Sequence, residues 1–526
     1  MNGKVGDFCR GAPALQSGGG YPACRPEYII VGIRRACQSP AVCSALALTL
    51  VLLGGCAVGP NFKQPSAPPD DSYTETPPRN TDSTPRINGG EAQQFVEGLE
   101  IPAQWWEVFH SKPLSDLIQR SLTNNPDLKG AQAALSEAHE NLLSQRSVFY
   151  PSVTGSFAAS RQKQSEALAP TPNENVFQFN LFTPQVSVSY MPDVFGLNRR
   201  TVEAAKAQEQ GVRYQMIATY LTLSANVVVA AVQEASLRAQ IETTRQLIDL
   251  SSNVVDIVRY QLTNGYASGL DLAAQESSLA QLTATLPPLL KELAQQRDLL
   301  AVLAGDFPGR HPGEPFELSS LHLPEDLPVS LPAKLVQQRP DILQAQENLH
   351  AASAQIGVAI ANRLPNITLT ADAGSTALSL EQVFTSGTGF WAIGGQLMQP
   401  IFQGGALLHQ ERAAKAAYLH AAQQYRSTVL TACQNVADTL HALEQDAAAL
   451  KTAAAASDSA KVTLDLSREQ WQVGYGSYVA MLNAEQTYQQ ARLGLVLAQA
   501  NRFADTAALF QAVGGGWWNR KDLKQN

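Results

Sequence analysis

The chain has 526 residues, of which 16% are charged and 7% are aromatic, and its formal net charge is −8. This length is enough for two or three ordinary cores. The acidic balance argues against a nucleic-acid partner, because the phosphate backbone selects basic surfaces. Only one of the six cysteines lies beyond residue 56, so the sequence predicts neither a disulfide framework nor a zinc site.

Residues 1–55 have the pattern of a signal region. The basic pair Arg34-Arg35 precedes a short apolar run from Ala41 to Leu53, which is the order of a secretory signal. Residues 1–30 are polar, Gly-rich and too long for the basic region of a signal, so we interpret them as a misassigned start.

The signal ends in Leu53-Gly54-Gly55-Cys56. Small residues before a cysteine resemble a bacterial lipobox, so Cys56 is the predicted lipidation site. An ordinary signal peptide with an incidental cysteine is the alternative. Ala57 in the next position, rather than Asp, resembles lipoproteins that are sent to the outer membrane.

Residues 56–112 are predicted to form a lipid-anchored tether and belt. The stretch 57–100 is rich in Pro, Thr, Asn and Asp without periodicity, which is typical of extended chain. Packing is expected to begin at Trp105-Trp106. Pro113 to Arg146 is then predicted as one long helix, because proline stands in its first turn and few breakers follow.

Apolar residues alternate with polar ones in two regions, 152–192 and 366–402. This period of two predicts strands, and a polar segment divides each region, so each is predicted to be one β-hairpin. From the sequence, no window beyond residue 56 is expected to be apolar enough for a transmembrane helix. If the chain spans a membrane, we therefore expect it to do so with its four strands.

Each predicted hairpin leads into a pair of long helices. The first pair covers 198–262 and 270–303, with a break expected at Pro287-Pro288. The second pair covers 406–473 and 479–510. These helices are rich in Ala, Gln and Ser with narrow apolar seams, which favours a helical tube with a wet lumen over a solid bundle.

The two halves repeat each other. Asn125-Pro126-Asp127-Leu128 matches Arg339-Pro340-Asp341-Ile342, and a unit of this length indicates duplication of a whole subdomain. We therefore divide the chain after the belt into a first repeat, a linker or equatorial belt, a second repeat and a C-terminal tail, which cover 113–305, 306–333, 334–513 and 514–526.

Four strands cannot close a membrane barrel, because open edges in lipid leave backbone groups unpaired. The smallest membrane barrels have about eight strands, and an eight-stranded barrel is filled by its own side chains. Three chains supply twelve strands, which leaves room for a lumen. The sequence thus predicts a mixed α/β membrane protein that works as a trimer.

This organisation resembles the outer membrane factor family, the TolC-like efflux ducts. Within it, the chain is most similar to the NodT/OprM-like lipoprotein branch that serves resistance-nodulation-division (RND) pumps. The resemblance extends from residue 56 to about residue 518. It rests on both Pro-Asp motifs and on Cys56-Ala57-Val58-Gly59-Pro60-Asn61-Phe62, Trp105-Trp106 with Phe109, and Gly514-Gly515-Gly516-Trp517.

The resemblance implies a homotrimer with a 12-stranded outer membrane β-barrel that continues as a 12-helix periplasmic barrel. It implies a passive duct that carries drugs, metals or other small toxic compounds from the periplasm to the exterior through an iris-like gate. The implied partners are a periplasmic adaptor, an inner membrane RND transporter and outer membrane lipid. No cofactor is expected beyond the covalent lipid.

The family closes its tunnel near the second turn with an apolar ring and an Asp ring. Aligned on Gly474, these places fall on Val479 and Asn483, so the usual carboxylate ring would be neutral here. The first half offers Leu270 and Asp271 instead. Three copies of Asp271 near the axis would favour cations. The alternative is that Asp271 caps its helix.

The two turns between paired helices are the predicted adaptor contacts, because exposed tips suit a tip-to-tip junction and Val-Gly resembles the family's tip motif. The need for positive φ also explains the glycines. The predicted contact residues are Gly265, Tyr266, Ser268, Gly474, Tyr475 and Ser477.

An enzyme is not predicted, since no nucleophile or phosphate-loop motif is present. Asp438, His441 and Glu444 share one helix face, but a solvated face explains this spacing better than a metal site does. Two alternatives to the efflux duct stay open: the duct of a type I protein-secretion system, and a lipid-anchored coiled-coil scaffold without a pore.

Overall fold

The computed structural model describes residues 57–69, 72–163, 178–310 and 315–521. All of them belong to one compact unit, Ala57–Asn526. The signal region and Cys56 lie outside the described residues.

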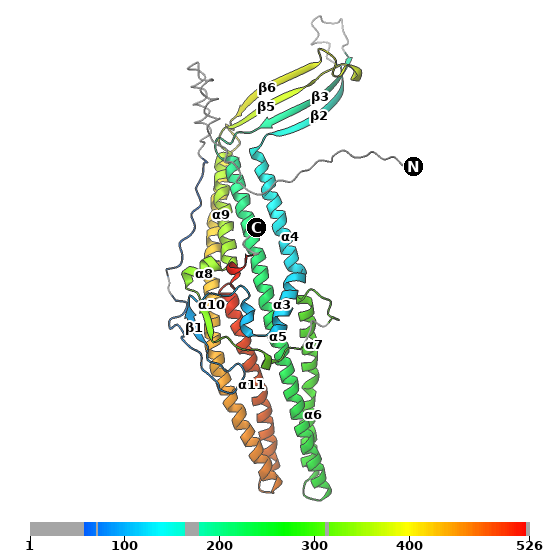
Figure 1. Cartoon of the computed structure of the whole chain (residues 1–526), viewed down its shortest axis with the longest axis vertical. Helices are drawn as coiled ribbons and strands as arrows, with labels where there is room; N and C mark the ends of the chain where they lie inside the picture. The colour runs from blue at the N-terminus through cyan, green and yellow to red at the C-terminus, as the bar shows by residue number, and fades with distance from the viewer. Residues whose placement is uncertain (1–56, 70–71, 164–177, 311–314, 522–526) are drawn as a thin grey trace, which may run out of the picture. The chain divides into compact units, whose positions relative to one another are not determined.

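Four long strands form one antiparallel sheet (Figure 1). The strands are β2 (Ser152–Lys163), β3 (Gln178–Tyr190), β5 (Asn366–Ser375) and β6 (Gly389–Met398). Their order is β2-β3-β5-β6, so the hairpin of each half pairs with the other through β3 and β5, with Val188 opposite Ala371. The four strands per chain that the period-two pattern predicts are therefore present, and β2 and β6 are the outer strands.

Two helices of 67 residues each dominate the rest of the chain. They are α5 (Leu197–Thr263) and α10 (Ala406–Gln472), and at about 1.5 Å per residue each is roughly 100 Å long. α10 turns back into α11 (Tyr478–Ala512). α5 turns back into α6 (Gly269–Ala284) and α7 (Leu286–Leu303), which are separate helices because Pro287 and Pro288 lack the amide hydrogens that would continue the ladder.

The prediction of one helix over Pro113–Arg146 is wrong. The structure has α3 (Lys112–Asn124) and α4 (Pro126–Arg146), separated at Asn125. The Asn125 side chain accepts hydrogen bonds from the backbone N–H groups of Asp127 (2.9 Å) and Leu128 (3.2 Å), so it starts a new helix. The second half is also divided into two helices here, α8 (Pro332–Gln338) and α9 (Pro340–Ala361), which meet at Arg339 without a side-chain cap.

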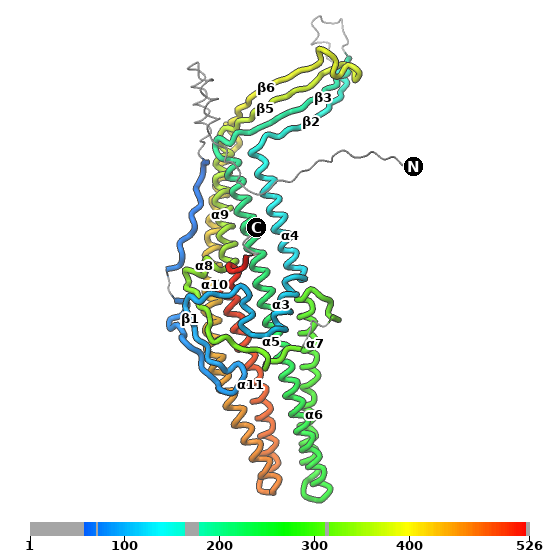
Figure 2. The backbone as a smooth tube through the Cα atoms, viewed as in Figure 1, coloured from blue at the N-terminus to red at the C-terminus, as the bar shows by residue number. Residues whose placement is uncertain are grey.

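The belt is more regular than predicted. β1 (Gln94–Glu97) pairs in parallel with β4 (Asp326–Val329), which joins the tether to the linker between the repeats. Figure 2 shows the segment from residue 57 to β1 running along the outside of the helices. The belt then inserts Trp105 and Trp106 into the main core, where Trp105 stacks on Phe510 with ring centroids 5.5 Å apart.

Among the residues that the structure describes, one helix qualifies as a membrane span by length and composition, contrary to the sequence-based expectation. α5 holds an 18-residue window of mean hydropathy 1.5, but 67% of that window is buried within the chain. Core helices pass the same test, so the window is weak evidence for a helical span.

Candidate functional site

The ends of the two helical hairpins lie next to each other, at the end of the helices away from the sheet (Figure 1). The α5–α6 turn, residues 264–268, is here called the first tip, and the α10–α11 turn, residues 473–477, the second tip. On the side of the tips toward the sheet, Val254 and Val258 of α5 pack with Met481 of α11 in a small buried cluster. The predicted tip residues of both halves are therefore brought into one region.

Both tips are built on a glycine in the left-handed region. The φ angle is +78° at Gly265 and +82° at Gly474, a conformation that side chains with a Cβ disfavour. A Cβ added at either position would meet no atom within 4 Å, so the backbone conformation and not the available space requires glycine. The following residues, Tyr266 and Tyr475, are both exposed, which suits a contact surface.

Asp271 is engaged as a helix cap. Its Oδ2 accepts hydrogen bonds from the backbone N–H (2.8 Å) and the hydroxyl (2.7 Å) of Ser268, and the Ser268 hydroxyl accepts from the Asp271 N–H (3.2 Å). This is a capping box, and the hydrogen bonds from Ser268 lower the pKa of the Asp271 carboxyl. The second tip lacks the box, because Ala480 stands in that place and Ser477 alone caps α11 through the Ala480 N–H.

The other predicted gate residues are open to solvent on the single chain. Leu270 is 78% exposed and Val479 is 63% exposed, and Asn483 is exposed one turn further along α11. Large apolar side chains at such exposure are available to meet another surface. Their place in a gate stays a prediction.

A network of hydrogen-bonded side chains joins the two hairpins, and it was not predicted from the sequence. The Tyr478 hydroxyl donates to Gln275 Oε1 (2.6 Å), and Gln275 Nε2 donates to Ser251 Oγ (3.2 Å) and Glu485 Oε2 (3.5 Å). Residues of three helices, α5, α6 and α11, thus meet at Gln275. The helical period could have indicated that Glu485 is buried, because it lies four residues after the buried Met481 and so on the same face of α11.

Glu485 is only 1% exposed, and this burial raises the pKa of its carboxyl. Gln275 and the positive charge of Arg468 act in the opposite direction. Within the described part of the chain, Glu485 Oε1 and two guanidinium nitrogens of Arg468 are buried without a hydrogen-bond partner. The contact between the two hairpins at Gln275 therefore buries charged groups, which costs desolvation free energy.

The metal-like triplet of α10 does not form a site. Over the described ranges, no group of three or more His, Cys, Asp or Glu side chains is arranged to hold a metal ion. Cys56, the predicted lipidation site, lies outside those ranges, so the structure does not bear on it.

Comparisons with known proteins agree with this architecture. The model of a family described as outer membrane efflux protein matches residues 117–306 and 331–515, one block in each repeat. The probable efflux pump outer membrane protein TtgC of Pseudomonas putida is 28% identical over 483 residues, which cover 90% of this chain and 96% of that protein.

Two solved outer membrane structures show a similar fold. The outer membrane protein VceC of Vibrio cholerae superposes with a TM-score of 0.72 at 27% identity, covering 79% of this chain and 99% of that one. The Campylobacter jejuni CmeC outer membrane channel superposes with a TM-score of 0.79 at 22% identity, covering 90% and 97%. These similarities cover most of both chains, so the fold is that of a TolC-like channel.

Proposed function

Because the chain belongs to the outer membrane efflux protein family, we propose that it is the outer membrane exit duct of a tripartite RND-type efflux pump. It passively conducts small toxic compounds from the periplasm to the exterior and performs no catalytic step. The observation that carries this proposal is the four-stranded sheet with two outer strands, continued by two long helical hairpins.

The outer strands support a trimer. β2 and β6 present backbone groups that lipid cannot satisfy, so each must pair with a strand of another copy. Three copies supply twelve strands, enough for a lumen, and six helical hairpins that continue it. The tips, with exposed Tyr266 and Tyr475, then face the periplasmic adaptor, through which the inner membrane transporter is reached.

We also propose that Cys56 carries a covalent lipid that anchors each copy in the outer membrane. The support is the lipobox pattern Leu53-Gly54-Gly55-Cys56. Radiolabelled palmitate should enter the wild-type protein and be lost in Cys56→Ala. Label that persists in the variant would overturn the lipoprotein proposal without touching the duct.

The duct is tested on the protein purified from outer membranes. We expect heat-modifiable trimers that conduct ions in planar bilayers, and we expect deletion of the gene to raise drug susceptibility as much as deletion of its cognate pump does. Non-conducting monomers would favour the coiled-coil scaffold. Loss of a secreted protein with unchanged drug resistance would favour the type I secretion duct.

A further inference from the structure

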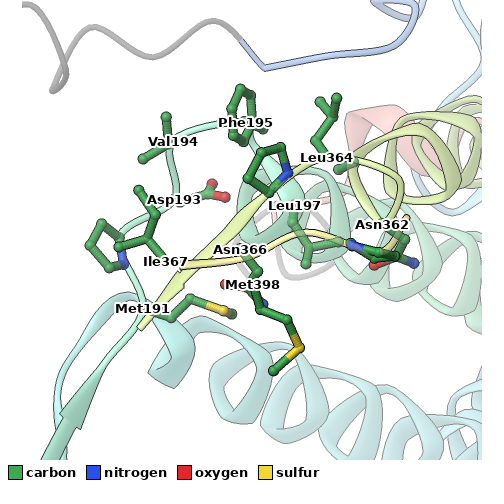
Figure 3. Close-up of a pocket in the computed structure, with 14 residues that line it drawn as sticks. Met191, Asp193, Val194, Phe195, Leu197, Asn362, Leu364, Asn366, Ile367 and Met398 are labelled. Carbon is green, nitrogen blue, oxygen red and sulfur yellow. The ribbon is translucent and has the colours of Figure 1, made fainter. Parts of the chain in front are cut away.

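A pocket of about 150 Å³ lies at the foot of the sheet, where β3 leads into α5 and α9 leads into β5 (Figure 3). Apolar side chains from both repeats dominate its lining, among them Met191, Phe195, Leu197, Leu364, Ile367 and Met398. A pocket lined mostly by apolar side chains can accept small apolar groups.

The one carboxylate in the lining is already occupied by protein. Asp193 accepts hydrogen bonds from the backbone N–H groups of Asn198 (3.0 Å) and Arg199 (2.9 Å), and from Arg199 Nε (3.1 Å). It caps the start of α5 and neutralises a guanidinium there. The pocket therefore keeps an apolar character despite this charged residue.

The beginning of the described chain is held at the edge of the pocket. The Val58 N–H donates to the Phe195 carbonyl (3.1 Å), and the Val58 carbonyl accepts from Arg200 Nε (3.0 Å). A Cβ on Gly196 would lie 2.5 Å from the Ala57 Cα, so Ala57 packs directly against Gly196. Gly196 itself stands between the lining residues Phe195 and Leu197.

Several further contacts hold residues 57–61 against the start of α5 and against α9. Arg200 is buried, and its guanidinium also donates to the Gly59 carbonyl (3.3 Å), Asn61 Oδ1 (2.8 Å) and Glu203 Oε2 (2.7 Å). A Cβ on Gly59 would lie 2.5 Å from the Cα of Gly357 in α9, so the two backbones touch. The sequence following the predicted lipidation site is thus fixed at the rim of the pocket.

The neighbouring part of the sheet is apolar and exposed. Trp391, Ile393 and Leu397 of β6 are all exposed on the single chain, and the lining residue Met398 ends the same strand. Strand faces of this kind meet lipid in membrane barrels. The pocket therefore lies where the membrane-facing sheet ends and the water-exposed helices begin.

We propose that this pocket binds a saturated acyl chain at the periplasmic boundary of the outer membrane. The inference rests on the proposed outer membrane location but not on conduction. The same chemistry has two sources, the lipid attached to Cys56 and the phospholipid of the bilayer. In either case the pocket fixes the level at which the foot of the sheet sits in the membrane.

The test places a photoreactive group at the pocket mouth of the full-length protein. Cells making the Met398→p-benzoylphenylalanine variant are fed radiolabelled palmitate and irradiated, and the purified trimers are digested with trypsin. Residue 398 lies in the tryptic peptide 364–412, whereas a lipid on Cys56 stays with peptide 56–63. We expect label in peptide 364–412, and we expect it to fall at least fivefold when Leu364→Trp fills the pocket.

The matched control carries the photoreactive group at Ile393, on the same strand and in the same peptide but outside the pocket. Its labelling should not respond to Leu364→Trp. If that filling variant does not assemble, Ala361→Leu fills the pocket from α9 instead. The proposal would be overturned if residue 398 is not labelled, or if its labelling does not fall in either Leu364→Trp or Ala361→Leu.

The Cys56→Ala background separates the two sources. Label retained in peptide 364–412 assigns the pocket to a membrane phospholipid, and label lost assigns it to the chain on Cys56. Conductance of the same trimers is recorded alongside. A pocket that fails to label in conducting trimers overturns only this inference, whereas trimers that do not conduct overturn the duct.

Discussion

The hydroxyl of Tyr478 and the side-chain amide of Gln275 join the two helical hairpins of one chain by a 2.6 Å hydrogen bond. The bond crosses from α11 to α6 at the level of the buried Val254, Val258 and Met481 cluster. The hairpins therefore meet through both apolar packing and a polar contact just behind their tips. Motion of one tip relative to the other must break that contact.

Loss of the Tyr478 hydroxyl should loosen the tips. Tyr478→Phe leaves Gln275 Oε1 buried without a donor, which costs about 1–3 kcal/mol. We expect faster amide hydrogen exchange over 264–272 and 473–483 and a higher single-channel conductance. Tyr475→Phe, which removes an exposed hydroxyl at the tip, is the control. Exchange that is equal in both variants would contradict a linking role for Tyr478.

The stability of the belt region should depend on pH through Asp446. Burial, and then the neighbouring carboxyl of Asp505, raise the pKa of Asp446 to about 7, against the opposing charge of Arg502. A carboxyl whose folded pKa lies above its unfolded value of about 3.9 contributes stability that is complete below pH 4 and lost as pH rises through 7.

We therefore expect the melting temperature of the protein to be a few degrees higher at pH 5 than at pH 8. Asp446→Asn should remove most of this difference, because the amide is neutral at both values. Asp465 is an exposed residue of α10, the helix that also contains Asp446, so Asp465→Asn should leave the difference in melting temperature in place. A pH dependence that survives Asp446→Asn would assign it to other groups.

Asp271 is both a cap and a candidate gate charge, and two variants separate these roles. Ser268→Ala removes the serine half of the capping box but keeps the carboxylate, whereas Asp271→Asn removes the charge. If three carboxylates line the gate, only Asp271→Asn should lower the cation-over-anion permeability ratio in planar bilayers. Equal ratios in the wild type and Asp271→Asn would leave Asp271 as a cap alone.

A bulky residue at the second tip should uncouple the duct from its pump. Gly474→Trp places a large side chain where the structure shows open space, so it should leave the trimer intact and abolish drug resistance. Gly474→Ala imposes the same left-handed strain, about 1–2 kcal/mol, without the bulk. Resistance should therefore fall far less in Gly474→Ala. Unchanged resistance in Gly474→Trp would exclude docking at this tip.

Local pattern accounts for most of the fold that could be predicted. The alternation of Val153, Gly155 and Phe157 lies within one strand, and the long Ala-rich segments lie within α5 and α10. Such patterns work because each element must expose one face and bury the other. The break at Asn125 has a local signal, Asn before Pro126, but proline in the first turn and few breakers beyond it favour one continuous helix, and only the cap formed by the Asn125 side chain divides it.

Contacts between distant segments were not predictable in the same way. β1 and β4 are separated by more than two hundred residues, and each is only four residues long, so neither has a periodic signal of its own. The pocket at the foot of the sheet is likewise assembled from both repeats. In both cases the residues that meet are determined by how the rest of the chain folds, and not by a local pattern in either segment.

Two residue pairs that the duplication repeats have different environments in the structure, which the sequence does not reveal. Arg259 and Glu276 recur as Arg468 and Glu485 at one constant spacing, and from the sequence alone the two pairs are equivalent. In the structure Arg259 and Glu276 form a surface ion pair at 3.0 Å, whereas Glu485 is buried against Gln275. The sequence by itself determined the long helices, the four strands of the large sheet, their order and their duplication. Only the packing of one hairpin against the other decided which copy of a repeated residue meets water and which is enclosed, because burial depends on the neighbour and not on the repeat.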